Sequence, residues 1–241
     1  MSSLKEKFET PLPTWVDEIS KEAHNKIITA PFAAECFEGS AEAVRKQMVG
    51  LWPFVDEFPH MLNRGCRRLF FNLDLMVRYG PVDVINLLSK GRQILQEIKV
   101  DEEDHRKLWL MTSEALGLQY PTDFSREVLP ETKVWMNKVD EKPDIPFMMF
   151  MRFTAIEIIA ESISCHLLGS KKFCDVLGKR GVRWFKAHVH PEDQRMTHKE
   201  LALHLGFAMH LWSPSKEECS RYIQEIVDLF LAAAEASRTA F

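Results

Sequence analysis

The chain has 241 residues, 46% of them hydrophobic, and a formal net charge of -4. This composition provides an ordinary buried core and excludes a disordered or fibrous protein. The 31 basic and 35 acidic side chains are mixed along the chain. No basic stripe is therefore available to neutralise phosphates, and no nucleic acid is expected as a partner.

The N-terminal segment has no apolar core of the signal-peptide kind, and the longest apolar run, IPFMMFM at 145–151, is too short to span a bilayer. The five cysteines are odd in number and form no CxxC pair, which is typical of reduced thiols. We therefore expect a cytoplasmic protein without a membrane partner.

Apolar residues recur at three- and four-residue spacing, and there are only 10 glycines and no hairpin signal. This pattern predicts an all-α protein. After a flexible segment at 1–13, the predicted helices cover 15–30, 41–70, 82–98, 101–117, 125–139, 147–168, 171–187, 191–211 and 215–238. Ser40 is the expected N-cap of the second helix, which Pro53 and Pro59 should kink or break. Without repeats or changes in composition, we expect one domain over 1–241, a single compact bundle of seven to nine helices.

The first candidate site lies in VDEEDHRKLW at 100–109, where Glu102 and His105 are three residues apart and share a helix face. A Glu-x-x-His pair on an inward face is how four-helix carboxylate proteins present an oxygen and a nitrogen ligand to one ion. In the structural alternative, the acidic run forms a charged first turn that the helix dipole stabilises, and His105 is only half-buried.

The second candidate lies in FTAIEIIAESISCHL at 153–167, an apolar segment that carries Glu157 and Glu161. A carboxylate in the core cannot stay ionised without a partner, because loss of solvent disfavours its charge. A metal ion or an arginine would have to compensate it. Neighbours at i and i+4 point the same way, so the two glutamates should share one environment, with Glu161 nearer the edge. One of them could instead face solvent.

The third candidate lies in KAHVHPEDQRMTHKE at 186–200. On a continuous helix His188, Glu192 and Arg195 would line one face, with His198 three residues further on. Asp193 falls in the first turn of the helix expected from 191. The alternative is a solvated helix start with ordinary surface histidines. Together the three segments offer carboxylates and imidazoles from separate helices, the donors that iron and manganese take.

Four segments resemble, in the right order, the heme-oxygenase-like helical proteins that include UndA fatty-acid decarboxylases, CADD-type proteins, PqqC and TenA. The quoted segments are EGSAEAVRKQMVGLWPFVDEFPHML, IKVDEEDHRKLWLMTSEALGL, TAIEIIAE and RWFKAHVHPED. The resemblance covers most of the chain and is closest in motif to the UndA and CADD types. It implies the heme-oxygenase-like bundle with a pocket inside it.

The resemblance also implies a ligand set for one or two iron ions, with manganese as an alternative metal and O2 as co-substrate. The matching positions are Glu102, His105, Glu157, His188 and, with glutamate in place of aspartate, Glu192. The family's last histidine falls on Arg195, which cannot ligate a cation. His198 or Asp193 could fill that place, with Glu161 as a further acid or base. The number of metal ions that bind, zero, one or two, therefore remains open.

The expected function is a non-heme iron oxidase or oxygenase that acts on a small organic or fatty-acid-like substrate, compatible with a homodimer. Pocket positions are expected at Trp52, His60 and Arg195, and at Phe150 and Phe153 in the Met- and Phe-rich stretch at 145–153, for which plain core is the alternative. A metal-free PqqC-like oxidase would use arginine and histidine as acid, base and anion site. A TenA-like hydrolase would need a reactive cysteine, and a CADD-type interaction protein an exposed apolar patch.

Overall fold

A computed structural model of the protein describes residues 10–69, 73–189 and 196–240, and contains no strand within these ranges. The all-α prediction is thus confirmed. The α-helices are α2 (Trp15–Ile28), α3 (Pro31–Phe37), α4 (Ala41–Gly50), α5 (Trp52–Arg68), α6 (Leu73–Tyr79), α7 (Pro81–Ala115), α8 (Pro130–Asp140), α9 (Pro146–Leu168), α10 (Lys171–Gly181), α11 (Arg183–Val189), α12 (His198–Met209) and α13 (Lys216–Ala240). A short 3-10 helix, Thr122–Phe124, precedes α8.

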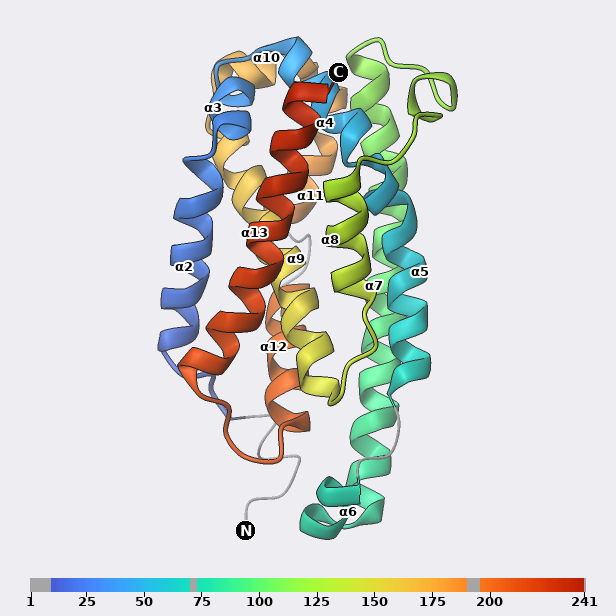
Figure 1. Ribbon diagram of the computed structural model, residues 1–241, viewed down its shortest axis with the longest axis vertical. Coiled ribbons are helices and arrows are strands. Elements are labelled where there is room, and N and C mark those ends of the chain that lie inside the picture. The colour runs from blue at the N-terminus through green and yellow to red at the C-terminus, as the bar shows by residue number, and fades with distance from the viewer. Residues whose placement is uncertain (1–9, 70–72, 190–195, 241) are drawn as a thin grey trace.

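The centre of the bundle is α9, which contacts α2, α11, α12 and α13. Its first half is buried on every side, because Phe147, Phe150 and Met151 are all fully enclosed. Figure 1 shows α9 behind α13, with α2 on one side and the pair α5 and α7 on the other. A helix that is buried and largely apolar in this way belongs inside a domain, so the Met- and Phe-rich stretch is core. Its one charged side chain, Arg152, is also buried and pairs with Glu141 at 2.7 Å.

Several predicted boundaries differ from the structure. The segment 41–70 is two helices, because the chain leaves the helix at Leu51 and begins α5 with Pro53 in its first turn. Pro59 lies inside α5 without ending it. Ser40 is confirmed as an N-cap, since its hydroxyl accepts a bond from the Ala43 N–H at 3.2 Å. These breaks and the short α3, α6 and α11 explain why the described residues contain more helices than the predicted seven to nine.

The most consequential difference concerns α7. Helices were predicted at 82–98 and 101–117, whereas α7 runs without a break over 35 residues. The acidic run at 101–104 is therefore mid-helix, and Lys99 spans the expected boundary by pairing with Glu103 at 2.8 Å. Glu102 and His105 consequently project from the middle of the longest helix, which holds them against the bundle interior. Among the described helices, none is long and apolar enough to cross a membrane.

Candidate metal centre

Five ionisable side chains from four helices meet at one place. They are Glu102 and His105 from α7, Glu157 from α9, His188 from α11 and His198 from α12, and they form two overlapping groups. In the first, ligand atoms of Glu102, His105 and His188 all lie within 4.8 Å of one another. In the second, the same limit holds for Glu102, Glu157 and His198. Glu102 belongs to both groups, so one carboxylate lies between them.

His188 is positioned by its own helix. Its Nδ1 atom lies 2.8 Å from the carbonyl oxygen of Trp184, one turn earlier. Since a carbonyl can only accept, Nδ1 carries the proton and Nε2 keeps its lone pair. Burial, aided by the neighbouring His105, lowers the pKa of His188 to about 4. This imidazole is therefore neutral and has the tautomer that a metal ligand needs.

Glu102 and His105 form a close pair, with Glu102 Oε1 3.1 Å from His105 Nδ1 and both side chains 13% exposed. Burial alone would raise the pKa of Glu102, but His105 beside it, with His188 and His198, lowers it. Burial works against the His105 imidazolium, yet the Glu102 carboxylate outweighs it and raises the pKa of His105 to about 9. In the metal-free protein the proton on His105 compensates the charge of the Glu102 carboxylate. A bound metal cation could compensate the same charge.

Glu157 has only a distant partner within the cluster. His198 Nδ1 lies 3.8 Å from Glu157 Oε1, while His198 Nε2 lies 3.0 Å from an oxygen of the exposed Asp101. Burial, with the Glu102 carboxylate adding to it, raises the pKa of Glu157 to about 7, although His198 and His105 oppose the shift. A buried carboxylate with so weak a partner is a feature typical of functional sites.

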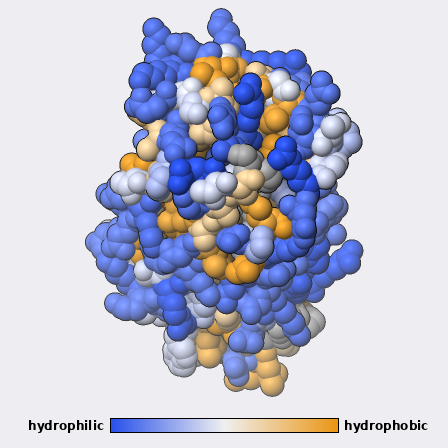
Figure 2. Space-filling model, turned by 45° about the horizontal axis from the view of Figure 1, so that its top comes forward, coloured by the Kyte–Doolittle hydropathy of each residue, from blue (hydrophilic) through white to orange (hydrophobic). Residues whose placement is uncertain are grey.

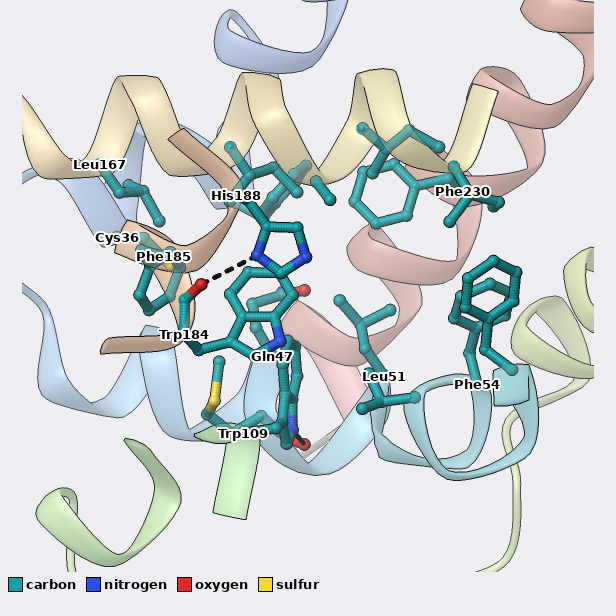
Figure 3. A pocket seen from close by; sticks show the side chains of 18 of the residues that line it. Cys36, Gln47, Leu51, Phe54, Trp109, Leu167, Trp184, Phe185, His188 and Phe230 are labelled. Atoms are coloured by element: carbon teal, nitrogen blue, oxygen red, sulfur yellow. Dashed lines mark hydrogen bonds between the residues drawn. The ribbon is translucent and has the colours of Figure 1, made fainter. Parts of the chain in front are cut away.

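These residues form one wall of an internal cavity of about 90 Å³. Glu102, Glu157 and His188 line it directly, and the remaining lining side chains, except the Gln47 amide, are apolar or aromatic. Figure 3 shows His188 in the middle of the lining, with its ring beside Trp184. No lysine or arginine is among the described residues that line the cavity.

Other predicted site residues lie elsewhere. Glu161 is 43% exposed and pairs with Lys199 at 2.5 Å, so the two glutamates of α9 do not share an environment as expected. His60 is exposed, in a surface groove between α5 and α7. Trp52, Phe150 and Phe153 are buried, but none is among the residues that line the cavity.

The structure explains why these aromatic side chains differ from their expected role. Trp52 packs against Phe124 with ring centroids 5.3 Å apart, and Phe153 packs against Phe58 at 6.0 Å. These rings fill the space between the helices, so they leave no room for a ligand beside them. Glu192, Asp193 and Arg195 lie outside the described residues, so their expected roles stay predictions.

The resemblance puts the family's last histidine at Arg195, so it predicts His198 only as a possible replacement ligand. In the structure α12 begins at His198, with a capping box in which Thr197 accepts from the Glu200 N–H and Glu200 accepts from the Thr197 N–H. The signal T-x-x-E was present in the sequence. It would have placed His198 in the first turn of α12.

The donor set suits a first-row divalent ion. Two carboxylates and three imidazoles are the ligands that iron and manganese accept, and the Nδ1–H of His188 is already bonded to a carbonyl. Without a cation the pair Glu102 and Glu157 must hold protons or rely on His105 and His198. The described residues therefore fit a metal ion at this place.

Neither models of known protein families nor characterised proteins match the sequence. The fold, in contrast, matches solved structures over almost the whole chain. A TenA homologue from Pseudomonas syringae has a TM-score of 0.73 at 16% identity, covering 98% of this chain and 97% of that chain. A TenA homologue from P. horikoshii has a TM-score of 0.59 at 15% identity, with both chains fully covered.

A domain of unknown function with a heme oxygenase-like fold, from Shewanella denitrificans, has a TM-score of 0.61 at 15% identity, covering 95% of this chain and 93% of that chain. The chain therefore has the heme-oxygenase-like fold of the TenA homologues, as the resemblance predicted. At these identities the likeness establishes the fold and leaves the activity, and the closeness to UndA and CADD types, as predictions.

Proposed function

We propose that the protein is a metal-dependent oxidase or oxygenase that uses iron and O2 on a small organic or fatty-acid-like substrate bound in the cavity. One observation carries the proposal: two glutamates and three histidines from four helices gather at the wall of an otherwise apolar cavity. Buried carboxylates cost stability unless they are compensated, so such a cluster is retained where it has a function.

The ligands would be Glu102, His105, Glu157, His188 and His198, with manganese as an alternative ion because it accepts the same donors. Bound iron supplies the one-electron chemistry that O2 requires and that no side chain provides. His188 presents a neutral Nε2 held by the Trp184 carbonyl. Before a metal binds, Glu157, whose pKa burial raises to about 7, can hold or release a proton at the cavity wall near neutral pH, and as a ligand it would be ionised. The apolar lining keeps water from the reacting atoms.

A hydrolase with a thiol nucleophile is disfavoured by the state of the cavity cysteine. Cys36 lines the cavity, but burial raises its pKa to about 12, so it is a protonated, inert thiol at neutral pH. The metal-free alternative would use Arg195, His198 and His60 together, and it is disfavoured because His60 lies in a surface groove outside the cavity, apart from His198.

One observation favours the alternative of a non-enzymatic interaction protein, namely exposed apolar side chains at one end of the molecule. Leu73 and Val77 of α6, with Val82 and Ile85 at the start of α7, are exposed by 45% to 82%. Figure 1 shows α6 at one end of the molecule, and Figure 2 shows apolar side chains in several groups surrounded by polar ones. An exposed tip, however, gives no role to the buried cluster, so we place the enzyme first.

The proposal is tested by loading the protein with ferrous iron under anaerobic conditions and measuring bound iron and the thermal midpoint. Wild type should bind iron and melt at a higher temperature with it. Glu102→Gln keeps the shape but removes the charge of the carboxylate that both groups share, and should lose most of that rise. Glu161→Gln, on α9 but outside the cluster, is the control, and it should behave as wild type. An equal rise in both variants would assign the metal to another place and refute the proposal.

A further inference from the structure

The cavity is long and narrow. Along α9 it is lined from Ile156 to Leu167, and eleven residues of helix rise by roughly 16 Å. Its volume is about 90 Å³. An engineered apolar cavity that admits benzene holds about 150 Å³ in a far more compact shape. A void so extended and so small suits the cross-section of a single chain better than that of a ring system.

The ionisable cluster lies partway along this void. In Figure 3 the Cys36, Leu167 and Phe185 side chains lie to one side of His188, whereas Leu51, Phe54 and Phe230 lie to the other side. We call the first group the aliphatic arm, after Leu167, and the second group the aromatic arm, after Phe54 and Phe230. The aromatic arm is tightly built, since Phe54 stacks on Trp135 at 3.9 Å and Trp135 meets Phe230 at 5.3 Å. Both groups line the same cavity.

Neither arm offers a charged partner. Outside the cluster the lining contains no lysine, arginine or carboxylate among the described residues. An ionised end group could therefore not be compensated at the far end of either arm. Transfer of methylene and methyl groups from water into either arm is favourable.

We infer that the cavity binds an unbranched apolar chain that passes the cluster and enters both arms, so that an internal position of the chain faces His188 and Glu157. The inference rests on the proposed function for the reaction itself, and it narrows the substrate to a chain with apolar groups on both sides of the reacting position. A substrate that reacts at its end would fill one arm only.

The test compares identical changes in the two arms. Leu167→Phe narrows the aliphatic arm and Leu51→Phe narrows the aromatic arm. The probes are straight-chain primary alcohols of increasing length, with cyclohexylmethanol as the branched control, and binding is measured by calorimetry on chelator-treated protein. In wild type the affinity should rise about fourfold for each added methylene until both arms are full. Cyclohexylmethanol should bind at least tenfold more weakly than the straight-chain alcohol with the same number of carbons.

Each Phe variant should stop this rise at a shorter chain than wild type does. Leu167→Ala and Leu51→Ala, which enlarge the arms, should each extend it, and they keep the test decisive if a Phe variant does not fold. Leu73→Phe, at a side chain 73% exposed, is the control without effect. The inference is overturned if changes in one arm leave the length limit unaltered, if the ring binds as well as the chain, or if no alcohol binds. Because no metal is present, these outcomes are independent of the iron-loading test.

Discussion

The Nδ1 atom of His188 donates to the carbonyl oxygen of Trp184 across 2.8 Å, one helical turn back along α11. This bond fixes both the tautomer and the direction of Nε2. It also explains how a helix of only seven residues, Arg183–Val189, can hold a ring firmly at the cavity wall. Trp184 supports the same ring by packing beside it, with centroids 4.2 Å apart.

A first prediction concerns this tautomer. In the metal-free protein His188 should remain neutral with its proton on Nδ1, because burial and His105 lower its pKa to about 4. Nitrogen-15 NMR of histidine-labelled protein between pH 5 and 8 should show one ring with unchanged Nδ1–H shifts. The signal should disappear in His188→Ala. A His188 ring that titrates near its ordinary value of about 6.5 would contradict the prediction.

A second prediction concerns the contact of α4 with α13. A Cβ atom at Gly50 would lie 2.1 Å from the Ser237 hydroxyl oxygen, so the two helices approach closely only because residue 50 has no side chain. Gly50→Ala should lower the free energy of unfolding by about 1–3 kcal/mol, the usual cost of overpacking. Denaturant unfolding measures this loss.

The matched variant of that experiment is Ser237→Ala, which removes the hydroxyl that Gly50→Ala would meet. The double variant should recover part of the loss, with an interaction energy above about 0.5 kcal/mol. Purely additive effects would show that the helices separate freely at this contact.

The sequence indicated the fold well because its strongest signals are local. Apolar spacing predicts helices, and the site positions Glu102 and His105 follow from a three-residue spacing that holds for any helix. It failed where the outcome depends on packing. The acidic run at 101–104 is a good helix start in isolation, but inside α7 it is stabilised by pairs such as Lys99 with Glu103.

The different environments of Glu157 and Glu161 show the same limit. Positions i and i+4 differ by about 40° around a helix of 3.6 residues per turn. That is enough to place Glu157 at the cavity and Glu161 beside Lys199 in the first turn of α12. Only the placement of α12, which carries both Lys199 and His198, decides this, and no pattern within α9 contains it.

A third prediction concerns pH. Burial raises the pKa of Cys36 to about 12, above the value of about 9 for the unfolded thiol. The protonated thiol therefore stabilises the fold below about pH 9, and this contribution is lost as pH rises towards 12, at about 1.4 kcal/mol for each pH unit. The difference in unfolding free energy between wild type and Cys36→Ala should shrink by about 1.3 kcal/mol between pH 10 and 11, where the unfolded thiol is almost fully ionised. A difference that stays constant would show that the thiol ionises in the folded protein.

The last prediction separates the two groups of ligands. The group of Glu102, His105 and His188 contains a neutral imidazole already oriented by Trp184, and should hold one iron tightly. The group of Glu102, Glu157 and His198 has no imidazole oriented in this way, because His198 Nε2 lies 3.0 Å from the exposed Asp101 and its Nδ1 is 3.8 Å from Glu157, and it should bind a second iron more weakly.

We expect His188→Ala to abolish tight binding and His198→Ala to remove only the weak ion, whereas Glu102→Gln weakens both because its carboxylate belongs to both groups. Metal-to-protein ratios after anaerobic loading, measured over a range of free iron, distinguish these cases. The resemblance implies that Arg195 stands where those proteins have their last histidine, so we expect Arg195→His to tighten the second ion at least tenfold. Two equally tight ions in wild type would show that His198 fully replaces that histidine and that Arg195 has no influence on the second ion.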